Sequence, residues 1–141
     1  MPENSEVLIG TQDGDHVLLR NWHYPSDDWT VADAELRCGP WQGVLKVWFY
    51  ARELEMFADE VKTLYRELRG TATLHPVESY LKLTLTGNGR GGIAVEGYAQ
   101  SDYVNDTKLY FQFSIDQTFL PRIADGLSHL PHKKPTILPS S

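Results

Sequence analysis

One glycine-rich segment of the chain has the spacing of a nucleotide-binding loop. Gly87, Gly89 and Gly92 match the pattern G-x-G-x-x-G, in which glycines bring the backbone close to a pyrophosphate at the start of a helix. No helix is predicted to follow here, because residues 93–98 have the alternation of a strand. Asn88-Gly89 between two such strands is typical of a β-hairpin turn. We therefore interpret the segment as a hairpin and predict that it binds no nucleotide.

Metal binding and thiol chemistry have little support in the sequence. The chain has five histidines, but only His129 and His132 lie close together, at the end of a predicted helix beside Pro131. A tetrahedral site needs three or four convergent ligands, so we predict no metal and no other cofactor. Cys38 is the only cysteine, and its neighbours match no nucleophile motif, which favours a small buried hydrophobic side chain.

Paired carboxylates could act as a general acid and base. Acidic pairs occur at Asp13 with Asp15, at Asp27-Asp28, and at Glu53 with Glu55. Each pair falls in a predicted turn or at the start of a predicted helix, where turn geometry and the helix dipole favour acidic residues. No serine has the G-x-S-x-G context of a hydrolase nucleophile either. We therefore predict that the protein is not an enzyme.

Aromatic side chains are the strongest candidates for a binding surface. Strand alternation places four of them on the face opposite the apolar side chains: Trp48, Tyr50, Tyr98 and Tyr110. Tryptophan and tyrosine among polar neighbours are typical of protein interfaces. Cross-strand aromatic pairs that only stabilise the sheet are an equally good explanation. We predict a partner-binding surface at these residues, together with the acidic turn Asp27-Asp28.

The composition is that of an ordinary single domain. The chain has 141 residues, of which 41% are hydrophobic and 23% charged, so it can bury a core of its own. Its net charge of −6 argues against nucleic acid as the main partner, because phosphate binding needs clustered Lys and Arg. The first residues have no leader pattern, and no apolar segment is long enough to span a bilayer. We expect a cytoplasmic protein without a membrane partner, and the single cysteine agrees with a reducing compartment.

Alternation and helical periodicity divide the chain into seven strands and two helices. The predicted strands span residues 7–11, 16–24, 29–38, 41–50, 80–86, 93–100 and 108–115. A long helix spans 51–69, and a short one begins near Asp116 or Thr118 and reaches Leu130. The order ββββαβββα indicates an α+β fold, in which an antiparallel sheet of about six to seven strands has both helices on one face. We expect one globular domain over residues 1–130, without an internal repeat, and a loosely ordered tail over 131–141.

Two segments carry a family resemblance. Residues 92–99, GIAVEGYA, and residues 109–121, LYFQFSIDQTFLP, together with the order of the elements, resemble small bacterial immunity proteins of the WapI type. The resemblance covers most of the chain. It implies a cytoplasmic antitoxin that binds a cognate toxin, often a nuclease, and so protects the cell that makes it. No functional residue is carried over, because the matching positions are hairpin, strand and cap positions.

Two other functions stay open at the level of sequence. The chain could bind a small molecule on or within a curved sheet, or it could be an assembly domain. A deep apolar pocket with convergent polar groups would favour the first, and a two-fold contact through the aromatic face would favour the second. The predicted partner is a toxin domain, and the protein itself is expected to be a monomer or a weak homodimer.

Overall fold

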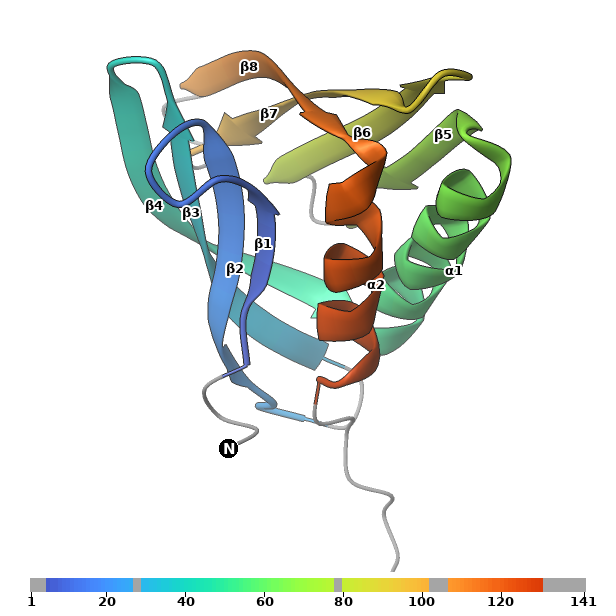
Figure 1. The fold of residues 1–141 in the computed structure, drawn as a ribbon. Coiled ribbons are helices and arrows are strands. Elements are labelled where there is room, and N and C mark those ends of the chain that lie inside the picture. The colour runs from blue at the N-terminus through green and yellow to red at the C-terminus, as the bar shows by residue number, and fades with distance from the viewer. Residues whose placement is uncertain (1–4, 27–28, 78–79, 102–106, 131–141) are drawn as a thin grey trace, which may run out of the picture.

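The computed structural model describes residues 5–26, 29–77, 80–101 and 107–130 (Figure 1). Its elements repeat one pattern twice, four strands followed by a helix. The first half contains β1 (Val7–Gly10), β2 (His16–His23), β3 (Trp29–Cys38), β4 (Trp41–Tyr50) and α1 (Ala51–Glu67). The second half contains β5 (Arg69–Leu74), β6 (Leu81–Asn88), β7 (Gly92–Gln100), β8 (Lys108–Asp116), the short 3₁₀ helix η2 (Gln117–Phe119) and α2 (Leu120–Ser128). This structural repeat was not predicted from the sequence. The predicted tail over 131–141 lies outside the described residues.

Each half forms its own sheet. The strand orders are β1-β2-β3-β4 in the first sheet and β5-β6-β7-β8 in the second, and every neighbouring pair is antiparallel. The α+β class and the antiparallel pairing are therefore confirmed, whereas the single sheet of six to seven strands is wrong. After α1 the chain starts a new sheet at β5, which pairs with β6 and not with a strand of the first sheet. The sheets meet near β3 and β8, where the Cys38 sulfur lies 3.8 Å from the carbonyl oxygen of Gln112.

Strand β5 was not predicted, and the helix before it is two residues shorter than the predicted 51–69. Helix α1 ends at Glu67, and Leu68 adopts a left-handed conformation with φ 65°. The N–H of Leu68 donates to the carbonyl of Leu64 at 2.7 Å, which closes the last helical turn. The chain then extends at once into β5, where Ala72 and Leu74 are the buried side chains. Two small or aliphatic side chains are a weak alternation signal after a strongly amphipathic helix.

The helices cover the inner face of each sheet. In Figure 1 they lie side by side, with α2 next to β1 and α1 next to β5. The apolar stripes of both helices and the inward side chains of both sheets belong to one hydrophobic core. Along β6, for example, Leu81, Leu83 and Leu85 are fully buried while Lys82 and Thr84 point the other way. Among the described residues, no helix covers the outer face of either sheet, as the one-sided alternation predicted.

The entry to the last helix follows the predicted capping. The carboxylate of Asp116 accepts a hydrogen bond from the N–H of Thr118 at 2.8 Å, so the chain turns into η2 directly after β8. Hydrogen bonds from Thr118 also hold the pKa of Asp116 below its ordinary value. Helix α2 itself begins later, at Leu120, with Pro121 in its first turn.

Candidate functional site

The first two predicted aromatic residues belong to a cluster on the outer face of the first sheet. Trp48 and Tyr50 lie on β4, and Trp29 joins them from β3 as the direct neighbour of Tyr50. The ring of Trp29 stacks on Tyr50 with centroids 4.3 Å apart and meets Trp48 edge-on at 5.7 Å. Trp48 keeps 36% of its surface exposed. We call Trp29, Trp48 and Tyr50 the tryptophan cluster.

The other two predicted aromatic residues form a second cluster on the outer face of the second sheet. Tyr98 on β7 and Tyr110 on β8 are cross-strand neighbours with ring centroids 5.8 Å apart. The hydroxyl of Tyr98 lies 3.3 Å from Nε2 of His75, and the ammonium of Lys108 lies 4.7 Å from the Tyr98 ring centroid. Tyr110 is 70% exposed. We call His75, Tyr98 and Tyr110 the tyrosine cluster.

The two clusters lie on different sheets, and one carboxylate forms hydrogen bonds with the backbone near each of them. Glu53, at the start of α1, accepts a hydrogen bond from the N–H of Tyr50 at 2.8 Å and another from the N–H of Val77 at 2.9 Å. Residues 75–77 connect β5 towards β6 and also carry His75 of the tyrosine cluster. Val77 itself is 67% exposed. An exposed apolar side chain therefore lies two residues from His75, on the segment that Glu53 holds.

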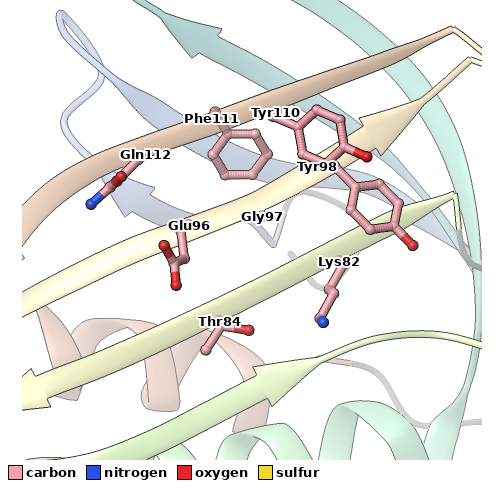
Figure 2. Close-up of a pocket in the computed structure, with 8 residues that line it drawn as sticks. All are labelled: Lys82, Thr84, Glu96, Gly97, Tyr98, Tyr110, Phe111 and Gln112. Carbon is pink, nitrogen blue, oxygen red and sulfur yellow. The ribbon is translucent and has the colours of Figure 1, made fainter.

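A hollow of about 580 Å³ lies beside the tyrosine cluster. Figure 2 shows its lining on the outer face of the second sheet, formed by Lys82, Thr84, Glu96, Gly97, Tyr98, Tyr110, Phe111 and Gln112. Gly97 is needed there because a Cβ at this position would overlap the carbonyl oxygen of Lys82. The missing side chain lets β6 and β7 approach closely below the hollow.

The charged groups on the outer face of the first sheet are largely paired with one another. Glu35 accepts from Arg20 at 2.7 Å and lies 3.1 Å from Nε2 of the buried His16. Asp33 accepts from Asn21 at 2.8 Å and from Lys46 at 3.0 Å. These two bonds, that from Asn21 first, hold the pKa of Asp33 below its ordinary value. Such pairs join β2, β3 and β4 and have a structural role.

The remaining candidate groups are accounted for by local structure. The glycine-rich segment is the hairpin between β6 and β7, as predicted, and the Asn88 side chain accepts from the N–H of Arg90 and of Gly92. Asp15 accepts from the N–H of Gly39. Within the described residues, no three His, Cys, Asp or Glu side chains are grouped in a way that could hold a metal ion. Asp27, Asp28 and His132 lie outside those residues.

Sequence reasoning missed three members of this surface. Trp29 could have been found from the register of the β3–β4 hairpin, because it pairs directly with Tyr50. His75 and Val77 follow the unpredicted strand β5, so no sequence pattern placed them. The carboxylate of Glu53 was interpreted only as a residue favoured by the helix dipole, whereas it also fixes a distant segment.

Comparison with known proteins identifies the family. Residues 8–135 match the Immunity protein WapI-like family, and the chain belongs to that family. The predicted resemblance is therefore confirmed, and the family indicates a toxin-neutralising immunity role. No curated protein matches the chain significantly.

One similar solved structure supports the fold alone. It is described as crystal structures of Trypanosoma brucei MRP1/MRP2, with a TM-score of 0.52 and 15% sequence identity. The alignment covers 92% of this chain and 84% of that one. None of the helices in the described parts of the chain is long and apolar enough to cross a membrane.

Proposed function

We propose that this protein neutralises a toxin by binding it through the tryptophan and tyrosine clusters, without catalysis of its own. Family membership supports the neutralising role. The observation that carries the choice of surface is the Glu53 carboxylate, which holds the backbone at Tyr50 and at Val77 and so joins the two clusters. One partner domain can then contact both sheets at once.

The exposed parts of this surface suit a protein partner. Trp48, Val77 and Tyr110 are among the large hydrophobic side chains that remain exposed. Aromatic residues are over-represented among the few contacts that dominate binding energy, because they bury much area at a small entropic cost. Trp29 and His75 hold two of the neighbouring rings in place, which reduces the cost of ordering them when a partner binds.

We further propose that the toxin is a nuclease and that the two proteins meet in the cytoplasm. A nuclease needs basic residues to bind phosphate, and this chain has a net charge of −6. Opposite charges raise the association rate more than the final affinity. Asp27 and Asp28, which directly precede Trp29 in the sequence, would contribute to this attraction.

A small-molecule function has weaker support. The hollow beside Tyr98 has a volume within the range of ligand sites, about 300–1,000 Å³. Such sites enclose most of their ligand among apolar side chains. This hollow instead lies on the open face of a sheet and is lined by Lys82, Glu96 and Gln112 among others (Figure 2). An exposed polar surface of this kind fits a macromolecule better.

The test is surface plasmon resonance against the toxin domain that we expect to be encoded beside this protein's gene. Trp48→Ala should weaken binding by about 2 kcal/mol, mainly through faster dissociation. Tyr65→Ala is the matched control, because Tyr65 is also an exposed aromatic residue but lies on α1. Circular dichroism confirms that each variant is folded. The interface would lie elsewhere if the folded variants all bound the toxin domain with the same affinity, namely Trp48→Ala, Tyr110→Ala and Tyr65→Ala.

A further inference from the structure

Glu96 is the one acidic residue in the middle of the second sheet's outer face. Three rows of cross-strand neighbours run across this face: Lys82, Tyr98 and Tyr110, then Thr84, Glu96 and Gln112, then Thr86, Ala94 and Ser114. Glu96 is exposed, and its direct neighbours Thr84 and Gln112 are neutral. No hydrogen bond or ion pair joins it to another residue in the described part of the chain.

This separates Glu96 from the carboxylates on the outer face of the first sheet. Asp33 and Glu35 each have a cationic partner within 3.0 Å, so their charge is already compensated inside the protein. The exposed Glu96 carboxylate is left to accept hydrogen bonds from water or from a group outside the chain. A carboxylate without a partner at an interface is costly to desolvate unless the incoming group is a cation.

The surroundings of Glu96 favour a planar cation. Tyr98 and Tyr110 supply aromatic rings along one side of the hollow (Figure 2), and the ammonium of Lys108 already lies over the Tyr98 ring at 4.7 Å. The electron-rich faces of such rings attract cations, and arginine uses them most often. A guanidinium also donates two parallel hydrogen bonds to a carboxylate. The Gln112 amide and the Thr84 hydroxyl add neutral oxygen acceptors beside it.

Two lysines restrict how a cation can enter. Lys82 shares the row of the two tyrosines, and Lys108 lies near the beginning of β8. Both are on the same side of Glu96 along the strands. The opposite side carries Thr86, Ala94 and Ser114, which are small and uncharged. Within the described part of the chain, no charged side chain therefore lies immediately beside Glu96 on that side, and Arg69 and Arg90 lie farther along, at the hairpin end of β6 and β7.

We propose that the hollow at Glu96 is a socket for an arginine side chain of the toxin. The guanidinium pairs with the Glu96 carboxylate and approaches the ring edge or free face of Tyr110. This inference rests on the proposed toxin-binding function, and it assigns the second sheet's outer face to the centre of the interface. The overall negative charge of the protein and the unpaired carboxylate both match a basic partner.

The first experiment measures binding of the neighbouring toxin domain to the parent, to Glu96→Gln and to Glu55→Gln. Glu55 is an exposed carboxylate on α1, so its variant removes the same charge from another surface. Glu96→Gln should bind at least about tenfold more weakly, mostly through faster dissociation. Glu55→Gln should stay within about twofold of the parent, as expected for a solvated charge away from the contact. Equal affinities of the two variants would overturn the socket while leaving toxin binding intact.

The second experiment needs no toxin. Amide NMR spectra of the parent are followed during titration with N-acetylarginine amide and, separately, with the neutral isostere N-acetylcitrulline amide. Saturable shifts at Glu96, Gly97 and Tyr98 are expected with the arginine compound only, and they should disappear in Glu96→Gln. Shifts that are absent, or equal for both compounds, would refute the socket. If the hollow binds the arginine compound but the parent does not bind the toxin domain, the proposed function fails and Glu96 marks an arginine site for another partner.

Discussion

Glu53→Gln is the substitution that most directly tests how the two aromatic clusters are joined. The parent carboxylate accepts from the N–H of Tyr50 at 2.8 Å and from the N–H of Val77 at 2.9 Å. Glutamine keeps one oxygen and replaces the other by an NH₂ group, so one of the two N–H donors loses its acceptor. Hydrogen bonds to a charged group contribute about 1.5–3 kcal/mol each, and partial exposure puts this one near the lower limit. The lost negative charge at the helix start costs about 0.3–1 kcal/mol more.

The expected loss is therefore about 2 kcal/mol in the free energy of unfolding. Urea titration followed by circular dichroism measures it, with Glu55→Gln as the control in the same helical turn. Hydrogen exchange at the Tyr50 or the Val77 amide should also become faster in Glu53→Gln, because one of these two N–H groups loses its acceptor. A loss below about 0.5 kcal/mol, equal to that of the control, would show that the carboxylate does not hold residues 75–77.

Two further predictions concern the core and the charged pairs. Phe111→Ala should lower the free energy of unfolding by about 3–5 kcal/mol, because this side chain is buried in the hydrophobic core. Gln112→Ala, on the opposite face of β8, should change it by less than about 0.5 kcal/mol. Similar losses in urea titration would mean that the faces of β8 are assigned backwards. The pKa of Asp33 in the folded protein is lower than its ordinary value of 3.8. Its paired carboxylate therefore stabilises the fold at pH values above 3.8, and this stabilisation is lost as the pH falls through the folded-state pKa. The stability difference between the parent and Asp33→Asn should therefore shrink on acidification, and a difference that grows in acid would contradict the pairing with Asn21 and Lys46.

Most strands and both helices of this fold could be predicted from the sequence, but the division of the strands into two sheets could not. Alternation along β6, β7 and β8 is unambiguous because leucine, isoleucine, valine and phenylalanine repeat on one side, and α1 has a wide apolar stripe. Strand pairing between distant segments has no comparable local signal. The short strand β5 has only Ala72 and Leu74 on its buried side, so its absence from the prediction also concealed the symmetry of the two halves.

The outward direction of the predicted site residues followed from the same alternation. Trp48, Tyr50, Tyr98 and Tyr110 do point away from the core, on two sheets rather than one. Glu53 links the tryptophan cluster to the segment that carries His75, through the backbone N–H groups of Tyr50 and Val77. A contact between a side chain and a backbone 24 residues away depends on tertiary structure, and residue type alone does not reveal it.

The most direct test of the central claim is protection of living cells. The neighbouring toxin domain is expressed in a susceptible host alone, with this protein, and with a folded variant that combines Trp48→Ala and Tyr110→Ala. The account predicts that the parent restores growth and that the double variant, present at the same level, does not. Equal protection by the double variant would contradict the proposed surface. A parent protein that neither restores growth nor binds the toxin domain in surface plasmon resonance would contradict the proposed function.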